Sequence, residues 1–275
     1  MIVDYHVHTP FCGHAHGKMA EYVETAINAG VAELGFSDHL GRYYLGRLQR
    51  KRYWDWGMPE KDLERYVAEV MELKQLYADK ISIKVGLEVD YIEGAEHLAQ
   101  CIISKFPFDF ILGSIHCLPA LGWYHLTHYT KAVPENVYTW YFAAARAALA
   151  SGLFQSIAHL DFVWRYIPWP EQRRVELITH ISDTVAVAVA SGVAIEINAN
   201  GYLWSQANFT RNFDPFDLML DVIKEKNATI TLGSDAHAPK LVAKFFPEII
   251  RILNKKGISL ASIFSKKKQS SVPLV

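Results

Sequence analysis

The chain has 275 residues, of which 51% are hydrophobic and 21% charged, and its formal net charge is −1. This composition is typical of a globular protein with a sizeable core, and the near-neutral charge argues against nucleic acid or acidic membranes as partners. Three scattered cysteines, no long apolar run and no signal-peptide pattern lead us to expect a cytoplasmic, reduced protein with one domain over residues 1–275.

Short apolar runs alternate with amphipathic stretches along the chain. The runs expected as strands cover residues 2–9, 33–39, 81–92, 108–116, 156–163, 193–198 and 228–237. The stretches expected as helices cover residues 19–30, 59–80, 94–105, 134–150, a segment ending near Gly192, 214–227 and 241–253. Gly30 is placed to end the first helix in a left-handed conformation, and Asp214 and Pro215 suit an N-cap and a first turn.

About seven strand–helix units in succession predict an α/β protein with a parallel sheet and helical crossovers. One barrel explains the pattern better than two domains, because no Pro-, Gly- or Ser-rich linker interrupts the alternation. A doubly wound open sheet is the alternative. In a barrel the C-terminal ends of the strands converge on one face, whereas an open sheet would spread these ends along a line too long for one site.

Every predicted strand ends in residues that carry charge or can bind metal. In chain order these are His6 and His8 with His14 just beyond, Asp38 and His39, Glu88 and Asp90, His116, His159 and Asp161, Glu196 and Asn198, and Asp235 and His237. Their repeated position favours the barrel, in which they meet at one mouth.

The spacing of the polar residues predicts metal binding. His6 and His8 are two apart in a strand, so both can reach one ion, and the same spacing recurs at Asp235 and His237. Imidazole with carboxylate suits zinc, manganese or iron, and the set is large enough for two or three ions with Glu88 as a bridge. The alternative is that each histidine is a hydrogen-bonded core residue, but it would place an unpaired polar group at every strand end.

Other histidines lie outside this pattern. His16 is expected in a loop, one step past a useful position. His125 and His128 follow the fourth strand and can either line the pocket or face solvent.

The motifs HVHTPFCGHA, GFSDH, GLEVDY, GSIH, AHLD, EIN and TLGSDAH occur in this order between residues 4 and 237. Together they resemble the polymerase-and-histidinol-phosphatase (PHP) superfamily. The opening DYHVHTPFCGHA, TLGSDAH and the chain length are most similar to histidinol-phosphatases of the PHP type. The resemblance implies a distorted (β/α)7 TIM-like barrel with a trinuclear metal centre.

The resemblance also groups the ligands. It implies three divalent ions of zinc, manganese or iron, held by His6, His8, Glu88 and Asp235, by Glu88, His116 and His159, and by His14, His39 and His237. Asp235 and His237 are the candidate catalytic residues. Ions about 3.5–4 Å apart can supply a hydroxide near neutral pH that attacks a phosphate ester.

The implied activity is hydrolysis of L-histidinol phosphate to L-histidinol and phosphate by a metal-dependent phosphomonoesterase. The alternatives are another phosphoesterase of the superfamily acting on nucleotides or other small phosphate esters, a non-catalytic metal-binding scaffold, and a metal-dependent amide hydrolase. We expect a small phosphate ester as partner, with no nucleic acid and no membrane.

Phosphate also needs cationic partners. Arg165 follows the fifth strand, Arg42 lies three residues beyond His39, and Arg211 lies in the long loop expected after the sixth strand. In the family the motif EIN is often followed by glycine and a basic pair. Here residues 202–204 are Tyr, Leu and Trp, so Arg211 is expected to supply the missing contact.

Overall fold

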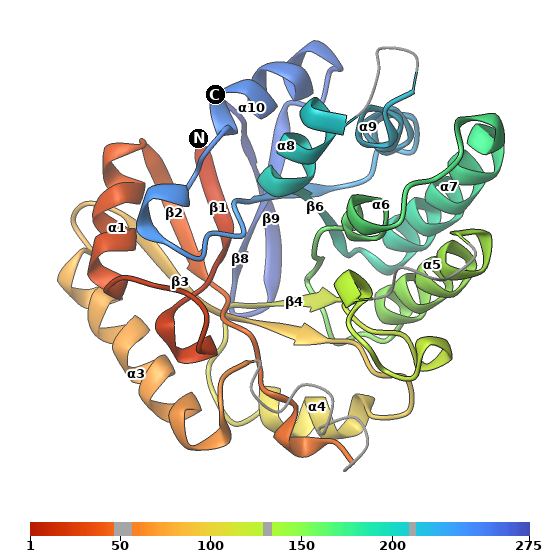
Figure 1. Ribbon diagram of the computed structural model, residues 1–275. Helices are drawn as coiled ribbons and strands as arrows, with labels where there is room; N and C mark the ends of the chain where they lie inside the picture. The colour runs from red at the N-terminus through yellow and green to blue at the C-terminus, as the bar shows by residue number, and fades with distance from the viewer. Residues whose placement is uncertain (47–56, 129–133, 209–212) are drawn as a thin grey trace.

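Seven parallel strands form the centre of the protein, and each pairs with its neighbours in sequence (Figure 1). The computed structural model describes residues 1–46, 57–128, 134–208 and 213–275. The strands are β1 Ile2–Val7, β2 Val31–Phe36, β3 Ser82–Asp90, β4 Phe110–Ser114, β5 Ser156–Ile157, β6 Ala194–Asn198 and β7 Ile230–Gly233. Apolar and β-branched residues dominate them, as expected for strands covered on both faces.

The first and last strands of the sheet meet just beyond their C-terminal ends. Val7 pairs with Ala236, the His8 amide donates to the Ala236 carbonyl at 3.0 Å, and the Ala236 amide donates to the His6 carbonyl at 3.3 Å. This closure lies beside the polar strand ends. The sheet is therefore a distorted (β/α)7 barrel, which confirms the expected fold and excludes the open sheet.

Helices follow the strands and surround the barrel (Figure 1). Their bounds are α1 Met19–Asn28, α3 Glu60–Leu76, α4 Glu96–Ile103, α5 Pro134–Ala150, α6 Phe162–Tyr166, α7 Arg174–Ser191, α8 Ala199–Asn208, α9 Pro215–Glu225 and α10 Phe246–Lys255. The two predicted helix ends are as expected, because Gly30 has φ 73° and the Asp214 carboxylate accepts a hydrogen bond from the Phe216 amide. Among the described residues, no helix combines the length and apolarity that a bilayer crossing requires.

The structure differs from the expected elements in three places. The strand expected over residues 156–163 stops at Ile157, because the chain leaves the sheet near His159 (φ 26°) and α6 begins at Phe162. Residues 199–208, expected as part of a loop, form α8. The C-terminal hairpin of β8 Leu260–Ser265 and β9 Lys268–Pro273 was not predicted.

The hairpin crosses the N-terminal ends of β1 and β4, opposite the polar strand ends. The Tyr5 ring contacts the Phe110 and Phe264 rings edge to face, with centroids 4.8 and 5.0 Å apart. The Phe264 amide also donates to the Tyr5 hydroxyl, and Gly86 leaves room that a Cβ would deny to the Phe110 ring. Tyr5, Phe110 and Phe264 form an aromatic plug that fills the barrel near the N-terminal ends of the strands. The mouth at the C-terminal ends therefore remains for the chemistry.

Candidate metal centre

Glu88, near the end of β3, lies at the centre of a cluster of imidazoles. It is buried, and its two oxygens face different partners. The Oε1 atom lies 3.0 Å from His159 Nε2 and 3.5 Å from His116 Nε2, whereas Oε2 lies 2.8 Å from His39 Nδ1, 3.2 Å from His6 Nε2 and 3.6 Å from His8 Nε2. A carboxylate shared in this way has the arrangement of a bridging ligand.

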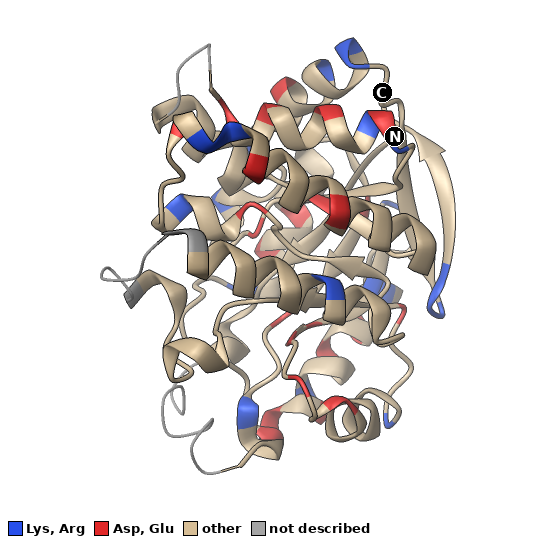
Figure 2. Ribbon diagram, turned by 90° about the vertical axis from the view of Figure 1, so that its right-hand side faces the viewer, with Lys and Arg blue, Asp and Glu red and all other residues tan. Residues whose placement is uncertain are grey.

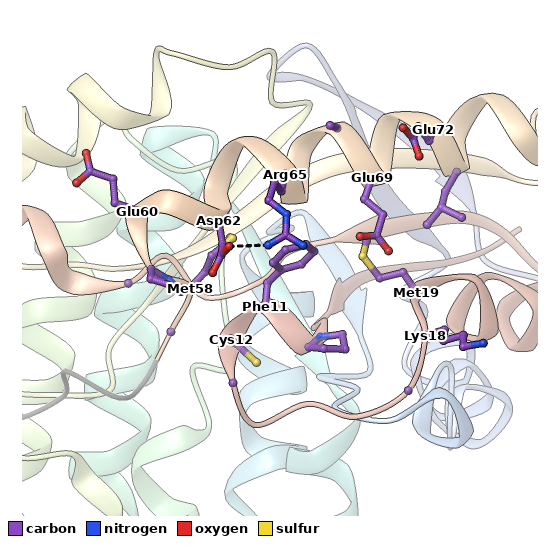
Figure 3. A pocket seen from close by; sticks show the side chains of 18 of the residues that line it. Phe11, Cys12, Lys18, Met19, Met58, Glu60, Asp62, Arg65, Glu69 and Glu72 are labelled. Carbon is purple, nitrogen blue, oxygen red and sulfur yellow. Dashed lines mark hydrogen bonds and ion pairs between the residues drawn. The ribbon is translucent and has the colours of Figure 1, made fainter.

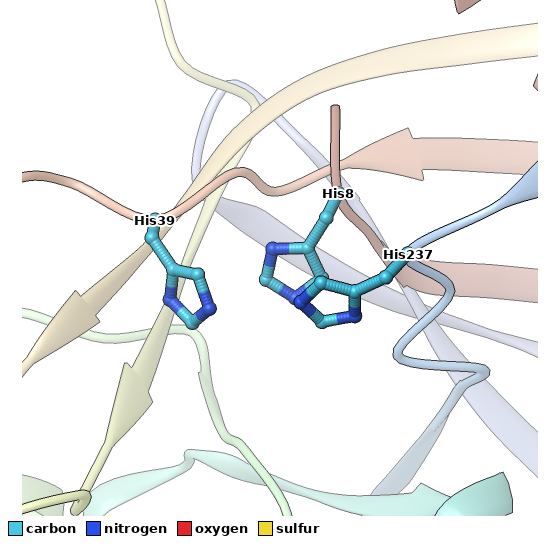
Figure 4. Close-up of side chains that lie close together, drawn as sticks. All are labelled: His8, His39 and His237. Carbon is cyan, nitrogen blue, oxygen red and sulfur yellow. The ribbon is translucent and has the colours of Figure 1, made fainter. Parts of the chain in front are cut away.

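Asp235 and His237 reach the cluster from the segment after β7. Asp235 takes a left-handed conformation (φ 55°) that turns its carboxylate inward, with Oδ1 3.1 Å from His8 Nε2. His237 Nε2 lies 3.0 Å from His14 Nε2. The rings of His8, His39 and His237 point toward a common space, as Figure 4 shows.

The nine predicted ligands lie in one connected cluster. In four sets of three, the ligand atoms lie within 4.8 Å of one another: His6, His8 and Asp235; His6, Glu88 and His159; His39, Glu88 and His116; and His8, His39 and His237. His14 adjoins the last set through His237. A fifth set joins His8 to Cys12 and Asp38, which were not predicted as ligands.

The donor atoms fit a metal centre better than a hydrogen-bonded core. A neutral imidazole carries one N–H, and His6 directs Nδ1 to Glu196 Oε1 at 2.6 Å. When His6 is neutral, its Nε2 lone pair therefore faces the His8 Nε2 atom at 3.0 Å and a carboxylate oxygen of Glu88. Acceptors brought together in a buried space need a cation between them.

Three buried carboxylates behind the cluster hold its imidazoles, and they were noted at strand ends without being assigned a role. Glu196 bonds His6, Asp90 Oδ1 lies 2.9 Å from His116 Nδ1, and Asp38 Oδ1 lies 3.4 Å from His8 Nδ1. Such partners orient metal ligands and raise their basicity. The sequence held a signal for this role: Asp38 and Asp90 lie within two residues of a predicted ligand, and Glu196 lies at the end of a strand that has no predicted ligand.

The protonation of the imidazoles divides the cluster. Burial lowers the pKa of His39 to about 4 and that of His237 to about 3, and the nearby His8 adds to both effects. Burial also opposes the charging of His6, but Glu196, Glu88 and Asp235 together raise its pKa well above the ordinary value. His39 and His237 are thus neutral at neutral pH and can act as metal ligands without losing a proton. His6 carries a proton that a bound cation would have to displace.

Arg165 lies at the edge of the cluster. It is only 4% exposed, its Nε donates to Asp161 Oδ2 at 2.5 Å and its Nη2 donates to Asn198 Oδ1 at 2.9 Å. Its Nη1 lies 4.0 Å from Asp235 Oδ2. The guanidinium is therefore held rigidly beside a predicted ligand and lines the same pocket.

Arg42 lies behind the cluster. Its side chain is 1% exposed, with Nη2 2.7 Å from Asp90 Oδ2 and 3.1 Å from the Cys117 sulfur. The cation is engaged by the carboxylate that holds His116, and it does not line the pocket that Arg165 lines, so its expected phosphate contact stays a prediction. Arg211 lies outside the described residues.

A cavity of about 350 Å³ opens onto the cluster. One side is formed by predicted ligands and the other by an aromatic and apolar wall from α6 and α8, lined by Phe162, Tyr166, Leu203 and Trp204. Of the two alternatives for His125, the structure favours the pocket: its ring stacks on His116 with centroids 5.4 Å apart. The His128 side chain lies outside the described residues.

A larger cavity, of about 1480 Å³, lies between the short helix at Pro10–Cys12 and α3 (Figure 3). Its lining contains acidic residues, Arg65 and apolar side chains but none of the described imidazoles. The chemistry therefore belongs to the smaller cavity.

Comparisons with known proteins agree with this geometry. Residues 4–200 match the PHP domain family. A probable histidinol-phosphatase of Deinococcus radiodurans is 29% identical, covering 98% of both chains, and a histidinol-phosphatase of Bacillus subtilis is 27% identical, covering 85% of this chain and 92% of its own.

The fold is also shared with a solved protein. The crystal structure of histidinol phosphate phosphatase from Lactococcus lactis, complexed with zinc, L-histidinol and phosphate, superposes with a TM-score of 0.81 at 24% identity, covering 98% of both chains. Because the family match spans most of the chain, including most of the cluster, this protein belongs to the PHP domain family.

Proposed function

We propose that this protein is a metal-dependent phosphomonoesterase that hydrolyses L-histidinol phosphate to L-histidinol and phosphate. The observation that carries the proposal is the cluster of imidazoles around Glu88, which opens into a pocket with one held guanidinium. The two relatives named histidinol-phosphatase, which this chain matches over 98% and 92% of their length, support the choice of substrate. We keep the expectation of a cytoplasmic location as part of this proposal.

The nine residues of the cluster would hold the ions, and we propose three of them, of zinc, manganese or iron. Divalent ions in such a site activate a water molecule and neutralise phosphoryl oxygens. The protein's part is to fix the ligands. Glu88 faces separate imidazoles with its two oxygens, and Glu196 and Asp90 hold the rings of His6 and His116 from behind.

Arg165 is the proposed phosphate contact. Asp161 and Asn198 fix two of its nitrogens, which leaves Nη1 on the side of Asp235 and the pocket. A guanidinium held in place binds a phosphoryl oxygen with little further loss of conformational entropy. Asp235 and His237 line the same pocket and are the proposed catalytic residues.

The aromatic wall is proposed to receive the alcohol part of the substrate. Phe162 and Tyr166 stand beside Leu203 and Trp204, and flat rings stack well on such surfaces. Acidic and basic residues are interspersed over the helices in Figure 2, and the net charge is −1. A small phosphate ester suits this surface better than a long nucleic acid.

A turnover panel tests the proposal. The metal-loaded protein is assayed with L-histidinol phosphate, nucleoside monophosphates and sugar phosphates, and we expect kcat/KM for histidinol phosphate to exceed the others at least about tenfold. The variant Glu88→Gln should be inactive, whereas Glu64→Gln, at an exposed position of α3, should match the unaltered protein. A nucleotide or sugar phosphate turned over faster would overturn the substrate.

A further inference from the structure

The cluster contains one group of ligands that differs from the rest. His39 and His237 gather with His8 and His14, and the two carboxylates that reach this imidazole group, Glu88 and Asp235, are both shared with His6. It is also the most accessible part, since the His237 side chain is 29% exposed and His14 is partly exposed. His6, His8 and Glu88 are buried.

The charges connected to the cluster balance two divalent ions, whereas a third needs a further anion. Side-chain contacts join six carboxylates and two guanidiniums to the ligands: Glu88, Asp235, Glu196, Asp38, Asp90, Asp161, Arg42 and Arg165. With neutral imidazoles, this described network carries a net charge of −4. Two divalent ions balance that charge, and a third leaves an excess of +2.

An excess of two positive charges in a largely buried site is costly unless an anion balances it. A phosphate monoester carries close to two negative charges at neutral pH. The pocket places such a group next to His14, His39 and His237, which all line it. The same group would then restore the charge balance and cover the accessible ligands.

From this we infer that the ion of the imidazole group and the phosphate bind cooperatively, while the other two ions stay bound without phosphate. The inference rests on the proposed function for its ligand. It assigns His14 a role that differs from the roles of His6 and His8, because His14 holds an exchangeable ion at the pocket edge. By linkage, phosphate must strengthen this ion's binding by the same factor as the ion strengthens phosphate binding.

The test is zinc binding by the full chain, measured by equilibrium dialysis and elemental analysis at free zinc concentrations set by a chelator buffer. The probe is inorganic phosphate, compared with chloride at equal ionic strength. Without phosphate we expect two tightly bound ions and a third that binds at higher free zinc. Phosphate should lower the midpoint of the third step about tenfold or more and leave the first two unchanged.

Two variants on one loop sharpen the result. His14→Gln should lose the third binding step and the effect of phosphate while retaining two ions. His16→Gln, whose side chain is exposed two positions away, should bind three ions as the unaltered protein does. Three equally tight ions without phosphate, or a third step that phosphate leaves unchanged, would refute the inference.

Turnover of histidinol phosphate, measured on the same samples, separates this inference from the proposed function. Loss of phosphate-linked zinc binding in an active enzyme overturns the inference alone. Phosphate-linked binding in a protein that does not hydrolyse histidinol phosphate overturns the proposed substrate alone.

Discussion

Glu196 lies on β6, a strand with no predicted ligand, yet its carboxylate binds the imidazole of His6 on β1. Its Oε1 faces His6 Nδ1 at 2.6 Å, and its Oε2 accepts hydrogen bonds from the His159 amide and from Asn198. It therefore fixes two ligands from β6. The residue type was visible in the sequence, but its partners were not.

Replacing Glu196 by Gln should weaken metal binding. The amide keeps the shape but must point an N–H group at a donor, so one of the two ligands loses its support. We expect zinc affinity to fall about 10- to 100-fold, measured by competition with a chelator. Glu64→Gln is the control, and equal affinities in the two variants would contradict the role of Glu196.

Arg165→Lys tests the phosphate contact. Lysine keeps the charge but lacks the planar fork that Asp161 and Asn198 hold, so the cation can no longer be fixed toward the pocket. We expect kcat/KM for the phosphate ester to fall about 10- to 100-fold with metal content unaltered. If metal content falls in parallel, Arg165 acts through Asp235 instead.

At the scale of elements, two helices decide the shape of the pocket. Helix α6 carries Arg165 and part of the aromatic wall, and α8 carries Leu203 and Trp204. Neither was predicted as a helix, because α6 is only five residues long and α8 shows little separation of polar and apolar faces. Their packing against each other places the substrate side of the site.

Gly201→Ala should disturb this packing. A Cβ at Gly201 would overlap the Asp161 carboxylate, which holds Arg165. We expect a loss of about 1–3 kcal/mol in the free energy of unfolding and a several-fold rise in KM for the phosphate ester. The measurement is a denaturant titration paired with steady-state kinetics.

Gly30→Ala is the matched control for Gly201→Ala. It forces a side chain into a left-handed conformation (φ 73°) far from the pocket, which costs about 1–2 kcal/mol. Its KM should stay unchanged. An equal rise in KM in both variants would show that lowered stability, not the position of Asp161, is the cause.

At the scale of the whole molecule, closure of the barrel brings charge from distant segments together. We propose that residues 1–275 act as one domain, because the C-terminal hairpin packs on Tyr5 of β1 and its partner strands. The aromatic plug at one end and the ligand cluster at the other divide the barrel into a stabilising half and a reactive half.

Metal binding should release protons. Carboxylates raise the pKa of both His6 and His8 well above the ordinary value despite burial, so in metal-free protein these rings hold protons at neutral pH. His39 and His237, with pKa values of about 4 and 3, are already neutral there. Zinc must displace the protons of His6 and His8, so its affinity falls as the pH falls.

Calorimetric titration of zinc in buffers of different ionisation enthalpy measures this release. We expect about two protons to be released per chain at neutral pH when zinc binds to His6 and His8. Affinity independent of pH between 6 and 8, with no dependence of the heat on the buffer, would contradict the protonation assigned to the two rings.

The sequence by itself predicted the barrel and the set of ligand candidates. Alternating apolar runs and amphipathic stretches are local properties of the chain, and in parallel strands the C-terminal ends necessarily share one edge. The spacing of residues such as His6 and His8 at the end of a predicted strand was therefore enough to place them at this edge. Short or irregular elements, such as α6 and the C-terminal hairpin, lack a local period and were missed.

Only the tertiary structure decided which atoms meet. Arg42 was expected at the phosphate, yet it binds Asp90 and thereby supports His116 from behind. Glu196 likewise gained its role through contacts with residues far away in sequence. Partners of buried charges depend on side-chain packing across the closed barrel, and spacing along one strand carries no record of that packing.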